Sequence, residues 1–297
     1  MNIQNKDQSL VGAFAALAAF SMWGFIPLYF KAVSHLPAFE ILAHRIVWTV
    51  FFVGMLIIIT GNLKNVHAVF ANRKLLATLL LSSLLISLNW LVFIWAISHD
   101  MVLQSSLGYF INPLVNVALG LIFLKERLRL LQWVAVGLSV IGVGNLIIQH
   151  GTIPWVALTL AISFGLYGLV RKIAVVDAQT GLFVETTIIL PPVLAYLIYI
   201  GIKGTGAFNP MDIQLTGLLM MAGLMTATPL VLFAIAAKRL LLSTIGFFQY
   251  IAPTGHFLLA VFLYNEPFTD AHKVTFGLIW LALAIYTVDT LFAHRRK

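Results

Sequence analysis

Long apolar runs recur along almost the whole chain, and the short segments between them hold most of the charged residues. A helix needs about 20 consecutive apolar residues to cross a bilayer. Turn-forming stretches such as TGNLKN and GTGAFNP separate some of the runs. The pattern predicts ten membrane-spanning helices, over residues 9–30, 38–60, 74–97, 103–123, 130–148, 153–170, 181–201, 214–237, 243–264 and 271–292. Nine helices is the nearest alternative, because the run at 153–170 is short and rich in Ser, Gly and Tyr.

Composition supports this interpretation. Hydrophobic residues make up 61% of the 297 residues and charged residues only 9%, whereas soluble domains average about 25% charged residues. The mean hydropathy is +1.00. Ten spans with short loops use nearly all of the chain, so almost nothing is left for a soluble domain. We therefore expect an all-α integral membrane protein.

Several kinds of chemistry are absent from the sequence. The chain has no cysteine, which excludes disulfides, thiol catalysis and cysteine-ligated metals. Its eight His are scattered without an HExxH motif, and no Gly-Lys dipeptide is present for a Walker A loop. No convergent set of nucleophile, acid and metal ligands is apparent. We therefore expect neither an enzyme nor a bound cofactor or metal.

The basic residues predict the orientation in the membrane. With the N-terminus in the cytoplasm, fourteen Lys and Arg fall on the inside, three fall on the outside, and Arg45 lies within a helix. The fourteen are Lys6, Lys64, Arg73, Lys74, Lys125, Arg127, Arg129, Arg171, Lys172, Lys238, Arg239, Arg295, Arg296 and Lys297, and the three are Lys31, Lys203 and Lys273. The positive-inside rule then predicts that both termini are cytoplasmic. The net charge of +8 is explained by attraction to anionic lipid, so no nucleic-acid partner is expected.

One element occurs twice in the chain. The stretch PLVNVALGLIFLKERL begins at Pro113, and PTGHFLLAVFLYNEPF begins 140 residues later at Pro253. Each carries a Glu thirteen positions after its Pro, at Glu126 and Glu266. The first copy ends in a basic cluster, and the second has lost its Lys and Arg. The two copies therefore share an apolar run and a Glu but differ in whether basic residues follow the run.

An inverted repeat explains this reversal. Five helices per half is an odd number, so the second half enters the membrane in the opposite sense. The stretch PAFE, ending at Glu40, also resembles GLFVE, ending at Glu185. We therefore expect one five-helix repeat over residues 1–148 and an inverted one over residues 149–297, an arrangement typical of secondary transporters.

Polar residues form matching stripes in the two equivalent helices of the repeat. The stripe of the fourth helix is Ser105, Tyr109, Asn112 and Asn116, and that of the ninth is Gly246, Gln249, Pro253 and His256. Spacings of three and four residues put each stripe on one helical face. Such residues either hold helices together or line a substrate cavity, and the matching of the two stripes favours a cavity. Asn89, Ser163 and Thr226 are weaker candidates on other helices.

The second helix carries the densest ionisable group, in FEILAHRIVW. Glu40 and His44 share one face, and Arg45 lies roughly 10 Å below the outer helix end at 1.5 Å per residue. Burying an arginine costs about 2.5–3.5 kcal/mol, so we expect a partner, with Glu40 the nearest acid in sequence. The group is either an outer gate, a site for anionic or carbonyl groups, or a structural ion pair. Glu40 and His44 are candidate proton relays, and His256 is the alternative.

The chain also resembles a known family. NPLVNVALGLIFLKERL and APTGHFLLAVFLYNEP are similar to the two EamA repeats of the drug/metabolite transporter superfamily. SMWGFIPLYFK, FEILAHRIVWT, NWLVFIWAI and SSLGYFINPL resemble the RarD-type permeases, a group whose members are named as chloramphenicol-sensitive proteins. The resemblance runs from about residue 9 to 292, although Ala252 replaces the Asn112 of the first repeat. It implies a permease of the bacterial inner membrane with a central cavity formed by both halves.

We therefore expect a secondary transporter for a small organic metabolite or drug, with export favoured by the family resemblance. The expected substrate-binding residues are Trp90, Tyr109, Asn112, Asn116, Gln249, Tyr250 and His256, and the expected gating residues are Glu40, His44 and Arg45. A passive channel for a small neutral solute is the alternative, because the same polar stripes would line a pore. Membrane lipid and the small-molecule substrate are the expected partners, and the small-residue helix faces are compatible with a homodimer.

Overall fold

The computed structural model describes residues 3–124, 129–237, 239 and 248–295, and most of them are helical. The helices are α1 (Ile3–Ala32), α2 (Ala38–Ile59), α3 (Leu63–Ala71), α4 (Arg73–Ser98), α5 (Val102–Leu124), α6 (Leu130–His150), α7 (Trp155–Ile173), α8 (Ala178–Ile202), α9 (Ile213–Ala237), α11 (Ile251–Leu258), the π-helix η1 (Leu259–Leu263) and α12 (Asp270–Arg295). Eight helices of the described residues are long and apolar enough to cross a membrane, and nine if the bent helix α5 counts as one span.

The all-α membrane architecture is confirmed, and nine of the predicted spans coincide with helices whose ends differ by no more than six residues. The doubtful span at 153–170 is the helix α7. The span predicted at 243–264 begins outside the described residues, and its remainder contains α11 and η1. The total of ten spans therefore stays a prediction.

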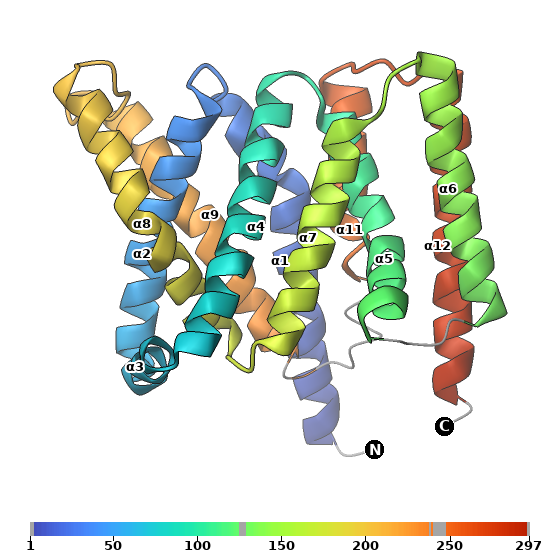
Figure 1. Cartoon of the computed structure of the whole chain (residues 1–297), viewed down its shortest axis with the longest axis horizontal. Coiled ribbons are helices and arrows are strands. Elements are labelled where there is room, and N and C mark those ends of the chain that lie inside the picture. Colours follow the sequence, from blue (N-terminus) through green and yellow to red (C-terminus); the bar gives the residue numbers. More distant parts are fainter. Residues whose placement is uncertain (1–2, 125–128, 238, 240–247, 296–297) are drawn as a thin grey trace.

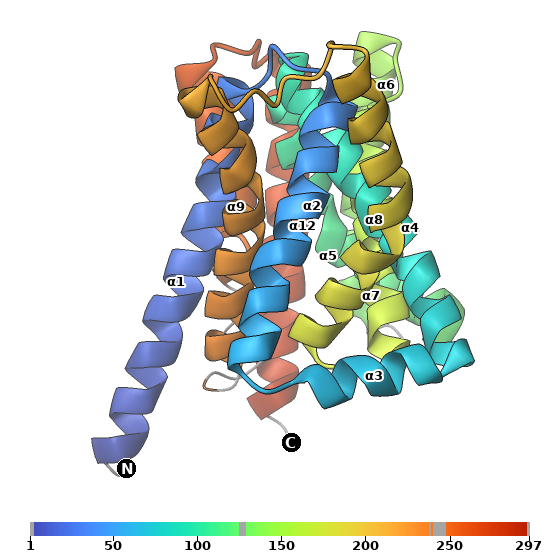
Figure 2. The ribbon, with the colours of Figure 1, turned by 90° about the vertical axis from the view of Figure 1, so that its left-hand side faces the viewer.

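One helix was missed by the sequence analysis. Residues 61–73 fell between two predicted spans, with TGNLKN read as turn-forming, but Leu63–Ala71 form α3, which buries Val66 and Val69. Figure 2 shows α3 lying across the ends of the longer helices rather than along them. With nine residues, α3 is far shorter than the run of about 20 apolar residues by which a membrane span is recognised.

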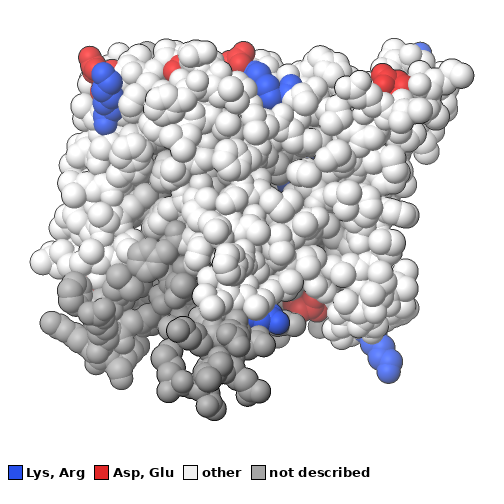
Figure 3. Space-filling model, turned by 180° about the vertical axis from the view of Figure 1, so that it is seen from behind, with Lys and Arg blue, Asp and Glu red and all other residues white. Residues whose placement is uncertain are grey.

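The long helices run side by side with both chain ends at the same edge of the molecule (Figures 1 and 2). α6 packs along α12 at one end of the bundle, and α2 packs against α8 and α9. Lys, Arg, Asp and Glu gather at the two edges of the face in Figure 3, and the band between them is almost uncharged. This distribution suits a bundle whose middle lies in lipid hydrocarbon.

Close helix contacts depend on glycine at several positions, of which Gly223 and Gly255 are two. A Cβ at Gly223 of α9 would lie 2.4 Å from the carbonyl carbon of Trp48 in α2. A Cβ at Gly255 of α11 would lie 2.8 Å from the carbonyl oxygen of Gly24 in α1. Because lipid is as apolar as leucine, helices in membranes associate through such close backbone packing.

We expect Gly223→Ala to lower the free energy of unfolding by about 1–3 kcal/mol, because the added methyl overlaps the α2 backbone. A Cβ at Gly217 of the same helix would meet no neighbouring atom within 4 Å, so Gly217→Ala is the matched control. We expect this control to be neutral or to gain up to about 1 kcal/mol of helix propensity. Unfolding in detergent micelles by SDS titration measures both, and equal stability of the two variants would contradict the close approach.

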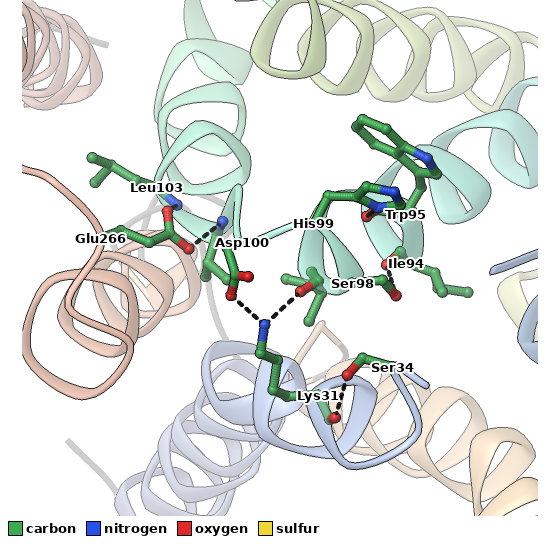
Figure 4. A network of polar contacts seen from close by, with 11 residues as sticks. Lys31, Ser34, Ile94, Trp95, Ser98, His99, Asp100, Leu103 and Glu266 are labelled. Atoms are coloured by element: carbon green, nitrogen blue, oxygen red, sulfur yellow. Dashed lines mark hydrogen bonds and ion pairs between the residues drawn. The ribbon is translucent and has the colours of Figure 1, made fainter. Parts of the chain in front are cut away.

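A polar network fixes the start of α5 at one edge of the bundle (Figure 4). The carboxylate of Glu266 accepts hydrogen bonds from the backbone N–H of Val102 at 2.7 Å and of Leu103 at 2.8 Å. The first N–H groups of a helix have no partner within the helix, and a negative charge there is favourable. Nearby, Lys31 of α1 forms an ion pair with Asp100 and donates to the carbonyl of Ile97 at 3.2 Å. The repeated Glu thus has a structural role in its second copy.

Burial raises the pKa of Glu266 above its ordinary value of 4.5, against the lowering effect of its two backbone hydrogen bonds. The folded protein therefore holds this proton more tightly than the unfolded chain does. The stabilisation from this proton is complete below pH 4.5 and is lost as the pH rises through the folded-state pKa. We expect the wild-type protein to lose stability relative to Glu266→Gln as the pH rises through this range, measured by SDS titration at several pH values. A wild-type stability that increases with pH relative to the variant would overturn this expectation.

Candidate functional site

Arg45 lies at the centre of the candidate site and is only 5% exposed. Its Nε donates a hydrogen bond to Oγ1 of Thr226 in α9 at 2.9 Å. Its guanidinium carbon lies 4.0 Å from the ring centroid of Trp90 in α4 and 5.4 Å from that of Phe30 in α1. A hydrogen bond to a charged group contributes about 1.5–3 kcal/mol, and a desolvated cation–π contact contributes about 2 kcal/mol. Together these contacts are comparable with the cost of burying the charge.

The expected pairing of Arg45 with Glu40 is wrong. The Glu40 carboxylate instead accepts a hydrogen bond from the backbone N–H of Ala207, in the connection between α8 and α9, at 2.6 Å. Five residues along a helix correspond to about 140° of rotation at 3.6 residues per turn. The two side chains therefore leave α2 in different directions, and each finds its partner on another helix or loop.

A second group of side chains lies beside Arg45. His256 of α11 packs its ring against Phe93 and Tyr109, with centroid distances of 5.4 Å and 5.7 Å. Its Nε2 lies 2.9 Å from the carbonyl oxygen of Trp23 in α1. A carbonyl only accepts, so Nε2 carries the hydrogen of this bond, and the buried Nδ1 has no partner among the described residues. Phe93 also contacts Phe30 at 5.8 Å, which makes the two groups continuous.

Neutral hydrogen bonds extend this centre towards α7. The Asn89 amide nitrogen donates to the carbonyl of Leu160 and to Oγ of Ser163, both at 3.0 Å. The Tyr109 hydroxyl donates to the Asn89 amide oxygen at 3.3 Å. Asn89, Ser163 and Thr226 were only weak candidates in the sequence, yet all three are part of the buried polar centre. Phe30 and Phe93 were missed altogether, since nothing distinguishes them from other apolar residues of a span.

The other predicted binding residues differ in burial and in their neighbours. The Asn112 side chain is buried, and neither of its amide atoms has a partner among the described residues. Asn116 is exposed, with its Oδ1 close to Gly165 of α7. The two lie on either side of the bend in α5, which measures 41°. Gln249 and Tyr250 are half-buried. Gly246 of the second stripe lies outside the described residues.

Two cavities flank the centre without including Arg45, Trp90, Tyr109 or His256. One, of about 330 Å³, lies between α2 and α8 and is lined by Glu40, His44, Trp48 and Phe208, among others. The His44 ring stacks on Phe208 at 5.5 Å, and its Nε2 has no partner among the described residues. The other, of about 310 Å³, lies between α1 and α11 and includes Tyr250. Glu40 and His44 thus belong to a site separate from that of Arg45.

A further ionic group was not singled out from the sequence. The buried Glu185 of α8 lies 3.6 Å from Nε of Arg171 in α7. It also accepts hydrogen bonds from the hydroxyls of Ser82 and Tyr167, the latter at 3.3 Å. Its similarity to Glu40 was the available signal, but its partners could not be identified because Ser82 is 103 positions away.

Comparison with known proteins identifies the class to which this architecture belongs. A model of the EamA-like transporter family matches residues 10–148. A protein of Vibrio cholerae named "Uncharacterized transporter" is 49% identical over 97% of this chain and 96% of its own length. A protein of Salmonella typhi named "Protein RarD" is 47% identical over 99% of this chain and 100% of its own. A solved crystal structure covers 96% of this chain and 98% of its own with a TM-score of 0.55 and 17% identity, which shows a shared fold.

The chain therefore belongs to the EamA-like transporter family and is a multi-pass membrane transporter. Within that family it is a permease of the RarD type, as the sequence motifs indicated.

The contact between Arg45 and Thr226 has a measurable consequence. We expect Thr226→Val to lower the free energy of unfolding by about 1.5–3 kcal/mol, because it removes the acceptor for a buried charged donor at nearly constant volume. Thr226→Ser keeps the hydroxyl and is the control. SDS titration of the purified protein measures both variants, and a valine variant as stable as the serine variant would refute the hydrogen bond.

Proposed function

We propose that this transporter moves a small organic molecule across the bacterial inner membrane by alternating access, with the substrate bound between the two halves of the chain. The hydrogen bond from Arg45 to Thr226 carries the proposal, because it joins the first half to the second at a buried polar centre. The contacts of His256 with Tyr109 and Phe93 also join the halves. Secondary transporters bind their substrates at such interfaces between repeats.

The helix contacts support two inverted repeats over residues 1–148 and 149–297. α1, the first span of the first half, packs on α9, the third span of the second half. α4, the third span of the first half, packs on α7, the first span of the second. A two-fold axis in the membrane plane produces this exchange of partners. Glu40 and Glu185 fit the same symmetry, since each lies in the first half of its helix and the two helices start at opposite edges in Figure 1.

The charges of the helix ends support an orientation with both termini in the cytoplasm. The edge that holds the two chain ends (Figure 1) also holds the exposed basic residues Arg73 and Lys74. At the opposite edge, Lys31 and Lys273 are paired with Asp100 and Asp270. The positive-inside rule assigns the first edge to the cytoplasm. Lipid is accordingly a partner of the whole perimeter.

In this mechanism the aromatic and amide side chains bind the substrate and the ionisable ones of α2 gate access. The substrate-binding set is Trp90, Tyr109, Asn112, Asn116, Gln249, Tyr250 and His256, and the gating set is Glu40, His44 and Arg45. The unpartnered amide of Asn112 and Nδ1 of His256 support the first assignment, because buried polar groups ordinarily find a partner. The cavity beside Glu40 and His44 supports the gating assignment of these two residues. Export is the proposed direction, following the resemblance to RarD-type permeases.

Solute counterflow in proteoliposomes tests the function. The panel holds amphenicol-like aromatic amides, neutral and aromatic amino acids, and sugars, each with and without a proton gradient. We expect saturable uptake that is accelerated by unlabelled solute on the opposite side, because a carrier exchanges faster than it returns empty. His256→Ala should slow exchange about tenfold or more. The variant leaves the substrate group that His256 would bind without a hydrogen-bond partner, which costs about 1–3 kcal/mol, and 1.4 kcal/mol corresponds to about tenfold.

The exposed Asn65 of α3 provides the control variant, Asn65→Ala, which should exchange at the wild-type rate. Uptake without acceleration by opposing solute would indicate a channel and overturn alternating access. Wild-type exchange by the monodisperse His256→Ala variant would remove His256 from the binding site.

A further inference from the structure

The positive charge of Arg45 has no negative partner in the described part of the chain. No carboxylate there lies within 4.0 Å of its guanidinium nitrogens. Described carboxylates have other partners: Glu40 with Ala207, Asp100 with Lys31, Asp177 with Thr180, Glu185 with Arg171, Asp212 with Leu215, Glu266 with Val102 and Leu103, Asp270 with Lys273, and Asp289 with Arg129. Rearranging any of them to neutralise Arg45 would leave another group unpaired.

The guanidinium also has unused hydrogen-bonding capacity. An arginine side chain offers five N–H donors in a planar fork, and only Nε donates to a described acceptor here. Neither terminal nitrogen is among the unpartnered atoms sealed from solvent, a set that does include Nη1 of Arg171. The terminal nitrogens of Arg45 therefore have no partner among the described residues and are not completely sealed from solvent.

The surroundings of this fork are neutral and largely aromatic. The titratable groups that interact with its charge are the phenols Tyr29 and Tyr109, which are uncharged at neutral pH. Tyr29 donates to the carbonyl of Leu218 at 2.8 Å, and Tyr109 donates to Asn89. Each phenol thus has its hydrogen committed elsewhere. The rings of Trp90 and Phe30 lie against the charge itself.

These features define the group that completes the site. A carboxylate matches two parallel N–H donors of an arginine and neutralises one positive charge. A dianion such as a phosphate monoester would leave an unbalanced negative charge in the buried centre. An amide or ketone offers one oxygen and no charge. The aromatic walls favour an apolar group beside the carboxylate.

We propose, on the basis of the transport function proposed above, that the substrate is a small organic monocarboxylate with an apolar or aromatic group, and that Arg45 binds its carboxylate. The apolar group packs against the ring cluster of Phe30, Phe93 and Tyr109. The substrate then supplies the counter-charge that the described part of the protein lacks. This extends the role of Arg45 from gating to direct recognition.

Matched acid and amide pairs test this proposal. Isothermal titration of the full-length protein in nanodiscs uses phenylacetate against phenylacetamide and indole-3-acetate against indole-3-acetamide, with phenyl phosphate as the dianion. We expect each acid to bind about tenfold or more tightly than its amide, because only the acid makes charge-assisted hydrogen bonds. Arg45→Gln should abolish the preference, and Arg45→Lys should retain part of it through its point charge. Asn65→Ala should leave it unchanged.

Equal binding of acid and amide by wild type overturns the proposal without any variant, so a poorly folded Arg45→Gln protein does not obscure the result. Tighter binding of phenyl phosphate, a preference that survives in folded Arg45→Gln, or no binding of either acid would also overturn it. Counterflow separates this result from the function itself. If neutral solutes exchange saturably and acids are not preferred, the transport function stands and the proposed monocarboxylate substrate is refuted. If acids bind but are not exchanged, alternating access is refuted.

Discussion

Arg45 carries a positive charge into the middle of a helix bundle, where water is scarce and each polar group has to find a partner in the protein or its ligand. Thr226 of α9 accepts one hydrogen bond from it, and the rings of Trp90 and Phe30 cover its faces. These partners come from α9, α4 and α1. The relative positions of four helices are therefore constrained by one guanidinium, and a shift of any one of them changes how well the charge is satisfied.

The carboxylates have a different distribution, and their roles are structural. Glu266 caps the start of α5, Glu40 holds the connection between α8 and α9, and Glu185 joins α7 to α8 through Arg171. Glu266 and Glu40 lie at helix ends, Glu185 lies two turns inside α8, and none of the three contacts Arg45. These acids thus hold helices and connections together, and the centre keeps a basic group and neutral polar groups. Such a centre is suited to an acceptor-rich ligand.

Close packing between helices holds the buried centre and the acidic contacts in place. At Gly223 and Gly255 the helices approach so closely that a methyl group would meet a neighbouring backbone. In lipid, this packing replaces the hydrophobic drive that holds soluble helices together. α1 and α11 join the two halves at one such contact and α2 and α9 at another, so the halves meet through tight backbone packing.

The sequence by itself determined the membrane class, the positions of nine spans and the family, because each span has to be apolar along its own length and the family motifs are local. It also identified Trp90, Tyr109 and His256 as candidates, since polar and large aromatic residues stand out in apolar helices. It could not identify the partners of Arg45, and proximity in sequence wrongly suggested Glu40. Thr226 is 181 positions from Arg45, and Trp23 is 233 from His256. Only the tertiary structure decided these contacts, because they depend on which helices adjoin and how each is rotated about its axis.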